Sequence, residues 1–148
     1  MTEKFAKIPV IFFLILLAGC IQYYDEIIID NGQSLIKINV EIADDNDERS
    51  KGLMFREKLD ESSGMFFIFE NEENRTFWMK NTLIPLDIIF IDENFEIVDV
   101  KYALPCKADS CALYKSAKPS KYVLEVNANF SAGNGINIGD KIILKEKY

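Results

Sequence analysis

The sequence predicts a mainly β or compact α+β fold, built as a small barrel-like sheet of about seven short strands with one or two short helices. Three observations support this fold class. Apolar and polar residues alternate along several short segments, turn residues separate these segments at close intervals, and the segments with helical character are brief. The chain shows no internal repeat and no low-complexity segment.

Two segments carry the clearest strand patterns. In residues 35–43, isoleucine and valine alternate with polar residues, which predicts a strand with one buried face and places Glu41 on the polar face. Residues 64–69 form a continuous apolar run, which is typical of a strand buried on both faces. In the polar stretch between them, Asp47 could cap a short helix that runs through residues 50–55.

Turn residues place the other elements. We expect a tether over residues 21–33, because it ends in the turn pair Asn31-Gly32, and a tight hairpin at residues 92–94, where Asn94 tolerates positive φ. The remaining expected segments are strands at 76–80, 86–91, 95–101, 122–127 and 141–145, a long irregular loop at 102–121, and a short helix or turn at 130–135.

Composition excludes several classes of function. The 148 residues carry a formal net charge of −7 and include no histidine. An acidic surface argues against nucleic acid as a partner, because phosphate binding depends on Lys and Arg. The lack of histidine excludes His-assisted hydrolases and ordinary zinc enzymes. Met54, Met65 and Met79 could bind copper(I), but their apolar surroundings favour gap filling. We therefore expect neither a metal nor a cofactor.

The N-terminus has the three zones of a secretory signal. Lys4 and Lys7 supply a basic stretch, residues 8–17 form an apolar run, and two small residues precede Cys20. The apolar segment is too short to cross a membrane comfortably, since a spanning helix needs roughly 20 apolar residues. Residues 17–20 (LAGC) also resemble the lipobox of exported lipoproteins, in which cleavage leaves a lipid-bearing cysteine at the new N-terminus.

These features predict an exported protein anchored on the outer face of the cytoplasmic membrane. We expect residues 1–19 to be a signal peptide, residues 20–34 to be a lipidated Cys20 with a tether, and residues 35–148 to be one globular domain. An ordinary signal peptide and an uncleaved anchor are the alternatives. A single acyl chain attaches only marginally, so stable anchoring requires the multi-chain lipid that the lipobox implies.

Cys106 and Cys111 are the other two cysteines of the chain. Outside the cytoplasm, two thiols this close in sequence are expected to form a local disulfide that stiffens a loop. The alternative is a redox pair or a thiolate–metal pair. The spacing is not C-x-x-C and no partner histidine exists, which disfavours that alternative.

Three clusters of residues resemble a known family. They are residues 52–56 (GLMFR), 77–92 (FWMKNTLIPLDIIFID) and 122–128 (YVLEVNA), with Gly139-Asp140 closing. Together they are similar to the domain-of-unknown-function 192 family, over about residues 36–145. The Gly64-Met65 pair and the loop with Cys106 and Cys111 also fit its exported members. The resemblance implies a small β-rich fold and no known reaction.

The second cluster suggests a binding cleft. It sets large apolar side chains beside a cation, an amide and a hydroxyl, a mixture that is typical of pockets. Asp87 opens an apolar stretch and would need a partner if it were buried, for which Lys80 or Arg56 is the natural choice. The alternative is a polar network that fixes strand register. The candidate ligand-binding residues are Arg56, Trp78, Lys80, Asn81, Thr82, Asp87, Tyr122 and Glu125.

Three functions fit these residues. The leading interpretation is a non-enzymatic module that binds a small ligand or an envelope protein through this cleft. A carboxylate-dependent hydrolase would use Asp87 or Glu125 as acid or base. A purely structural envelope protein is the third class.

The lipid hypothesis makes a direct prediction. Cys20→Ser removes the sulfur atom that the lipobox would place at the new N-terminus to carry a thioether-linked lipid, so the protein should leave the membrane fraction. Fractionation followed by immunoblotting measures this. Unchanged membrane retention of the variant would instead indicate an uncleaved anchor.

Overall fold

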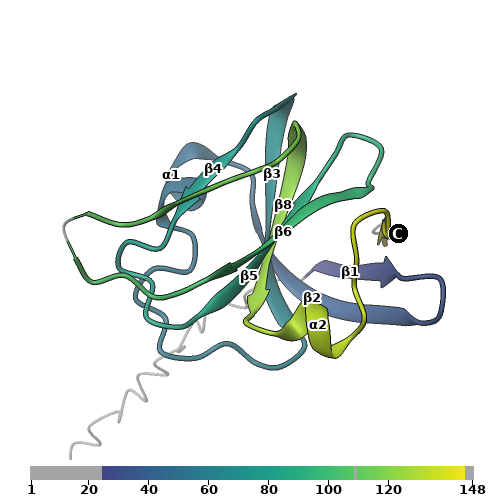
Figure 1. Ribbon diagram of the computed structural model, residues 1–148, viewed down its shortest axis with the longest axis horizontal. Helices are drawn as coiled ribbons and strands as arrows, with labels where there is room; N and C mark the ends of the chain where they lie inside the picture. The colour runs from purple at the N-terminus through teal and green to yellow at the C-terminus, as the bar shows by residue number, and fades with distance from the viewer. Residues whose placement is uncertain (1–24, 109, 146–148) are drawn as a thin grey trace, which may run out of the picture.

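The structure is a computed structural model that describes residues 25–108 and 110–145. It confirms a mainly β fold with two short helices (Figure 1). The leader and Cys20 lie outside the described residues. The elements in chain order are β1 (Asp25–Asp30), β2 (Leu35–Ala43), α1 (Asn46–Lys51), β3 (Ser63–Glu73), β4 (Thr76–Trp78), β5 (Leu86–Ile91), β6 (Ile97–Ala103), β7 (Leu113–Lys115), β8 (Ser120–Asn127), α2 (Phe130–Gly133) and β9 (Lys141–Leu144).

Seven strands form one curled sheet in the order β6-β5-β8-β3-β2-β1-β9. Its pairs are antiparallel except for β2 with β3, which run parallel. The two edges of the sheet approach each other, because Ile97 N donates to Asp140 O at 2.9 Å and Ile142 N donates to Phe95 O at 2.8 Å. The sheet therefore wraps round a barrel-like interior, as the sequence predicts.

Side-chain alternation gives this sheet two separate apolar cores. The barrel interior holds residues such as Ile29, Phe66 and Leu124. The outer face of the sheet carries a second core around Phe67 and Phe90. The two-stranded β4–β7 sheet and the segment after α1 cover this outer core, because Leu53, Phe77, Met79 and Tyr114 pack into it.

The expected tether is wrong for residues 25–30. This segment is strand β1, which pairs with β2 on one side and with β9 on the other. Ile27 and Ile29 point into the barrel and are buried. Three consecutive isoleucines show no alternation of apolar and polar residues, so the sequence does not indicate a strand here. The segment forms a strand because β2 and β9 pair with it on both sides.

Three further expectations about local structure are corrected. The helix lies at Asn46–Lys51 rather than 50–55, because the carboxylate of Asp45 accepts from Glu48 N at 2.8 Å and Gly52 ends the helix at φ 48°. In the hairpin, Phe95 rather than Asn94 adopts positive φ, at 59°. The expected irregular loop at 102–121 contains strand β7.

The loop before β7 contains the expected disulfide between Cys106 and Cys111. Within the described ranges, no helix has the length and apolar character needed to cross a membrane.

Candidate functional site

Glu125 is the most unusual polar residue of the sheet. It lies in central strand β8 between Met65 of β3 and Ile88 of β5, and only 5% of it is exposed. It shares the outer face of the sheet with the core around Phe67. Among the described residues, its carboxyl has no hydrogen-bond or ion-pair partner. A buried carboxyl without a partner is costly, so its position calls for a functional explanation.

Two glycines let the backbone close around Glu125. A Cβ on Gly64 would stand 2.6 Å from the carbonyl oxygen of Glu125, closer than real Cβ atoms approach. A Cβ on Gly52 would lie 3.4 Å from the Phe67 ring and 3.9 Å from Glu125 Oε2, and Gly52 also has φ 48°. Gly64 is therefore required because no Cβ fits at its position, and glycine is favoured at position 52 by the positive φ.

The carboxyl of Glu125 lines a small opening, which we call the Glu125 slot. Its volume is about 30 Å³. A water molecule occupies about that volume in the liquid, so the slot has room for one small chemical group and not for a whole sugar or nucleotide. The residues that line it are Arg49, Ser50, Lys51, Gly52, Leu53, Met54, Phe67, Phe77, Trp78, Thr82 and Glu125.

Burial raises the pKa of Glu125 from 4.5 to about 8, because the apolar surroundings disfavour the charged form. The carboxyl therefore keeps its proton at neutral pH. A protonated carboxyl has one O–H donor and one carbonyl acceptor, so it can make two hydrogen bonds to a single group that has both functions.

Three of the predicted site residues meet in this slot. They are Trp78, Thr82 and Glu125. The Lys80 ammonium adjoins them, because its Nζ lies 5.5 Å from the centroid of the Trp78 ring. Asn81 helps to shape the nearby backbone, since it has φ 57° and its carbonyl oxygen accepts from Phe55 N at 2.8 Å.

The other predicted site residues lie elsewhere. Arg56 pairs with Glu41, with Arg56 Nη1 donating to Glu41 Oε1 at 2.6 Å. Glu41 is therefore buried rather than on an exposed polar face. Tyr122 stacks between Phe66 and Phe95, at centroid distances of 5.5 and 4.7 Å.

Asp87 is buried, but the expectation that Lys80 or Arg56 neutralises it is wrong. Its two carboxylate oxygens accept from Asn129 N at 3.1 Å and from Ser131 N at 2.9 Å, and so fix the start of α2. These backbone amides lie far along the chain, and only the pairing of β5 with β8 brings them to Asp87.

The strand register also separates the two carboxyls of the hydrolase hypothesis. Asp87 lies opposite Val126, whose side chain is in the barrel interior, whereas Glu125 lies opposite Ile88, whose side chain is in the outer core. Asp87 and Glu125 therefore face opposite sides of the sheet and cannot act on the same bond.

Sequence reasoning missed the apolar walls of the slot. Gly52 and Met54 were visible within the first resembling cluster, but nothing in their local pattern connects them with Glu125. The sequence around Phe67 and Phe77 indicates only that both are core residues. In the part of the chain that the structure describes, no group of three His, Cys, Asp or Glu side chains comes together as a metal site would require.

Comparison with known proteins identifies the family of this chain. The family model described as an uncharacterized ACR, the domain-of-unknown-function 192 family, matches residues 27–144. The chain belongs to this family. A UPF0127 protein from Pyrococcus abyssi (strain GE5 / Orsay) is 31% identical over 105 residues, which cover 70% of this chain and 83% of that protein.

Two solved structures resemble the family fold seen here. A candidate transcription regulator from Sinorhizobium meliloti 1021 is 30% identical, with a TM-score of 0.77 over 83% of this chain and 95% of that chain. A protein of unknown function from Novosphingobium aromaticivorans DSM 12444 is 33% identical, with a TM-score of 0.76 over 81% of this chain and 84% of that chain.

The three clusters that carry the family resemblance converge on the slot. Residues 52–56 supply Gly52 and Met54, residues 77–92 supply Trp78 and Thr82, and residues 122–128 supply Glu125. Each of the three clusters therefore contributes at least one residue to the lining of the Glu125 slot.

The role of Asp87 can be tested by Asp87→Asn. Asparagine has a single acceptor oxygen, so one of the two backbone N–H groups loses its partner and the free energy of unfolding should fall by about 1–3 kcal/mol. Chemical denaturation measures this. Asp60→Asn, at an exposed position, is the control and should change little. Equal stability of the two variants would show that the α2 contacts contribute nothing.

The raised pKa of Glu125 predicts a pH dependence of stability. In the unfolded chain the carboxyl loses its proton near its ordinary pKa of 4.5, whereas the folded protein keeps it until about pH 8. The folded state therefore binds more protons between these values, and the free energy of unfolding should fall as pH rises, by on the order of 5 kcal/mol from this group.

Glu125→Gln should remove this part of the pH dependence, because the amide does not ionise in this range. The measurement is urea denaturation at a series of pH values between about 5 and 9. Glu61→Gln, which changes an exposed carboxylate, should retain the wild-type slope. Parallel curves for wild type and Glu125→Gln would contradict a raised pKa at this site.

Proposed function

We propose that this domain is a binding module that takes one small group of a larger molecule into the Glu125 slot. The observation that carries the proposal is a buried carboxyl without a partner among the described residues, facing an opening of about 30 Å³. The size of the slot favours a protruding group over a complete ligand. The body of the molecule would rest on exposed apolar side chains beside the slot, Trp78 (48% exposed) and Phe55 (65% exposed).

An amide is the group that best matches the slot. Its N–H donates to the carbonyl oxygen of protonated Glu125, and its oxygen accepts from the O–H of the same carboxyl. Met54 and Phe77 offer apolar walls to the carbon atoms next to the amide. Because Asn and Gln side chains carry a primary amide that can present N–H and oxygen to the same carboxyl, the natural partner is proposed to be a protein or peptide of the cell envelope.

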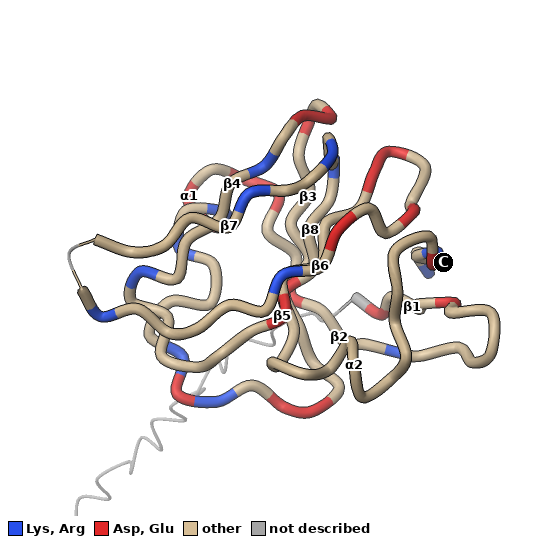
Figure 2. The backbone as a smooth tube through the Cα atoms, viewed as in Figure 1, with Lys and Arg blue, Asp and Glu red and all other residues tan. Residues whose placement is uncertain are grey.

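The proposed place of action is the outer face of the cytoplasmic membrane, with a lipid on Cys20. The basic and apolar zones of the leader and the LAGC sequence support export. The disulfide between Cys106 and Cys111 fits an oxidising compartment. Nucleic acid is not proposed as a partner, because the net charge is −7 and Figure 2 shows basic residues interspersed with acidic ones.

A hydrolase that uses Asp87 with Glu125 is not favoured, because the two carboxyls face opposite sides of the sheet. A purely structural role remains distinguishable from binding. It predicts that the slot takes up no small amide and that Trp78 reports no change when one is added.

Trp78 provides the test, since it is the single tryptophan of the chain and lines the slot. Propionamide should change its fluorescence in a saturable way, and propylammonium and propionate should do so less. Glu125→Leu replaces the carboxyl with an apolar side chain of similar size and removes both hydrogen bonds, so the affinity for propionamide should fall at least about tenfold.

Asp87→Asn is the matched control, because it alters a buried carboxylate on the opposite face of the sheet, and it should bind propionamide as wild type does. Raising the pH above about 8 should weaken binding to wild type, because Glu125 then loses its O–H donor. An equal response of wild type and Glu125→Leu would remove Glu125 from the proposal.

A further inference from the structure

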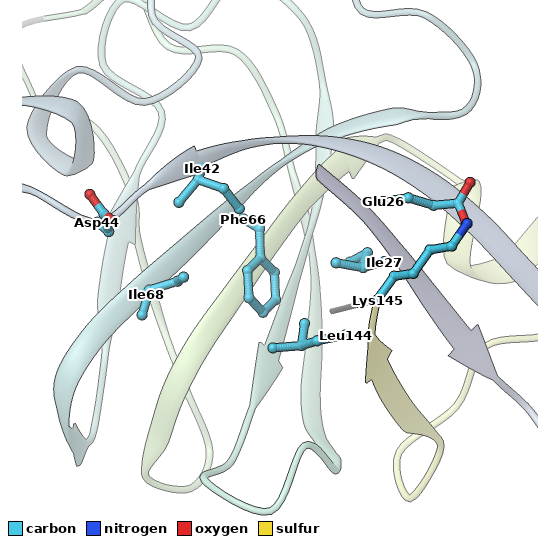
Figure 3. Close-up of a pocket in the computed structure, with 8 residues that line it drawn as sticks. All are labelled: Glu26, Ile27, Ile42, Asp44, Phe66, Ile68, Leu144 and Lys145. Atoms are coloured by element: carbon cyan, nitrogen blue, oxygen red, sulfur yellow. The ribbon is translucent and has the colours of Figure 1, made fainter. Parts of the chain in front are cut away.

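A second hollow lies at the open end of the barrel, and we call it the barrel-mouth pocket. Its volume is about 310 Å³, roughly ten times that of the Glu125 slot. Strands β1, β2, β3 and β9 surround it, so it lies on the opposite side of the sheet from Glu125. Figure 3 shows the side chains that line it.

The floor and walls of this pocket are apolar. Five side chains from the four strands point toward a common space (Figure 3). They are Ile27, Ile42, Phe66, Ile68 and Leu144. Ile27 and Phe66 belong to the buried barrel core, so the pocket extends this core to the surface. A hollow of this size with such walls favours an aliphatic guest over water.

Charged groups lie only at the rim of the pocket. On one side, Lys145 Nζ contacts Glu26 Oε1 at 2.9 Å, so these two charges neutralise each other. On the other side lies Asp44 (Figure 3). Its carboxylate has no hydrogen-bond or ion-pair partner in the ranges that the structure describes. Around Asp44, the Arg49 guanidinium donates to its backbone oxygen and the Glu48 carboxylate accepts from its backbone N–H. With two carboxylates and one guanidinium, this side of the rim has a net negative charge next to an apolar interior.

We propose that the barrel-mouth pocket binds a single aliphatic chain with an amino head group, with the chain in the hollow and the ammonium beside Asp44. With a volume of about 310 Å³, the pocket is large enough for a medium-length aliphatic chain. A fatty acid fits less well, because its carboxylate would meet Asp44. This site is independent of the amide-binding function proposed for the Glu125 slot.

The test uses the full chain in phosphatidylcholine nanodiscs with a diazirine-bearing decylamine as photoaffinity probe. Peptide mapping after irradiation should locate the label on β2, β3 and β9. Decylamine should compete about fivefold better than decanol, since a charge pair at contact distance contributes about that factor in water. Decanoate should compete less well than decanol.

Two variants separate the chain from the head group. Asp44→Asn should abolish the preference for decylamine over decanol while labelling at the pocket persists, and this exposed position does not threaten folding. Ile68→Trp should fill the hollow and block labelling. Leu35→Trp, at an exposed site outside the pocket, is the matched control and should label as wild type does.

Three results would overturn the proposal. The first is labelling that Ile68→Trp leaves unchanged, and the second is a preference for decylamine that survives Asp44→Asn. The third is pocket labelling that occurs only in Cys20→Ser, which would show that a lipid on Cys20 occupies the hollow itself. None of these results depends on whether the Glu125 slot binds an amide.

Discussion

The alternation of side chains along the central strands β5 and β8 is the constraint on which the rest of the structure depends. Along β8, Leu124 and Val126 enter the barrel, while Val123 and Glu125 face the outer core. The same rule sends Asp87 of β5 to the barrel side. One buried carboxyl is thereby directed to backbone amides and the other to a small opening. Their different chemistry follows from this geometry.

The energetics of these two carboxyls differ in the same way. Asp87 has two hydrogen bonds from α2, so its charge is compensated and it contributes to folding. Glu125 is buried without a hydrogen-bond or ion-pair partner among the described residues, and this burial raises its pKa to about 8 and makes ionisation costly. Gly52 and Gly64 allow the chain to close round it, so the structure maintains the slot at the expense of stability. Such local costs are typical of functional sites.

Much of the fold could be predicted from the sequence, because it follows from local patterns. The alternation in residues 35–43 and the apolar run in 64–69 specify strands that the structure contains as β2 and β3. The errors occur where a distant segment decides the outcome. Residues 25–30 become a strand only because β2 and β9 lie beside them, and Glu41 is buried because Arg56 pairs with it.

By itself, the sequence determined the strand-rich composition, the acidic charge, the lack of histidine and the family pattern, since each depends on residue types or on short-range order. It also identified Trp78, Thr82 and Glu125 as site candidates. Only the tertiary structure decided that these three residues line one slot and that a pocket opens at the barrel mouth. It also decided that Arg56 pairs with Glu41 and that Asp87 accepts from backbone amides of α2. The reason is that register between non-adjacent strands sets which side chains share a face, and no local pattern encodes that register.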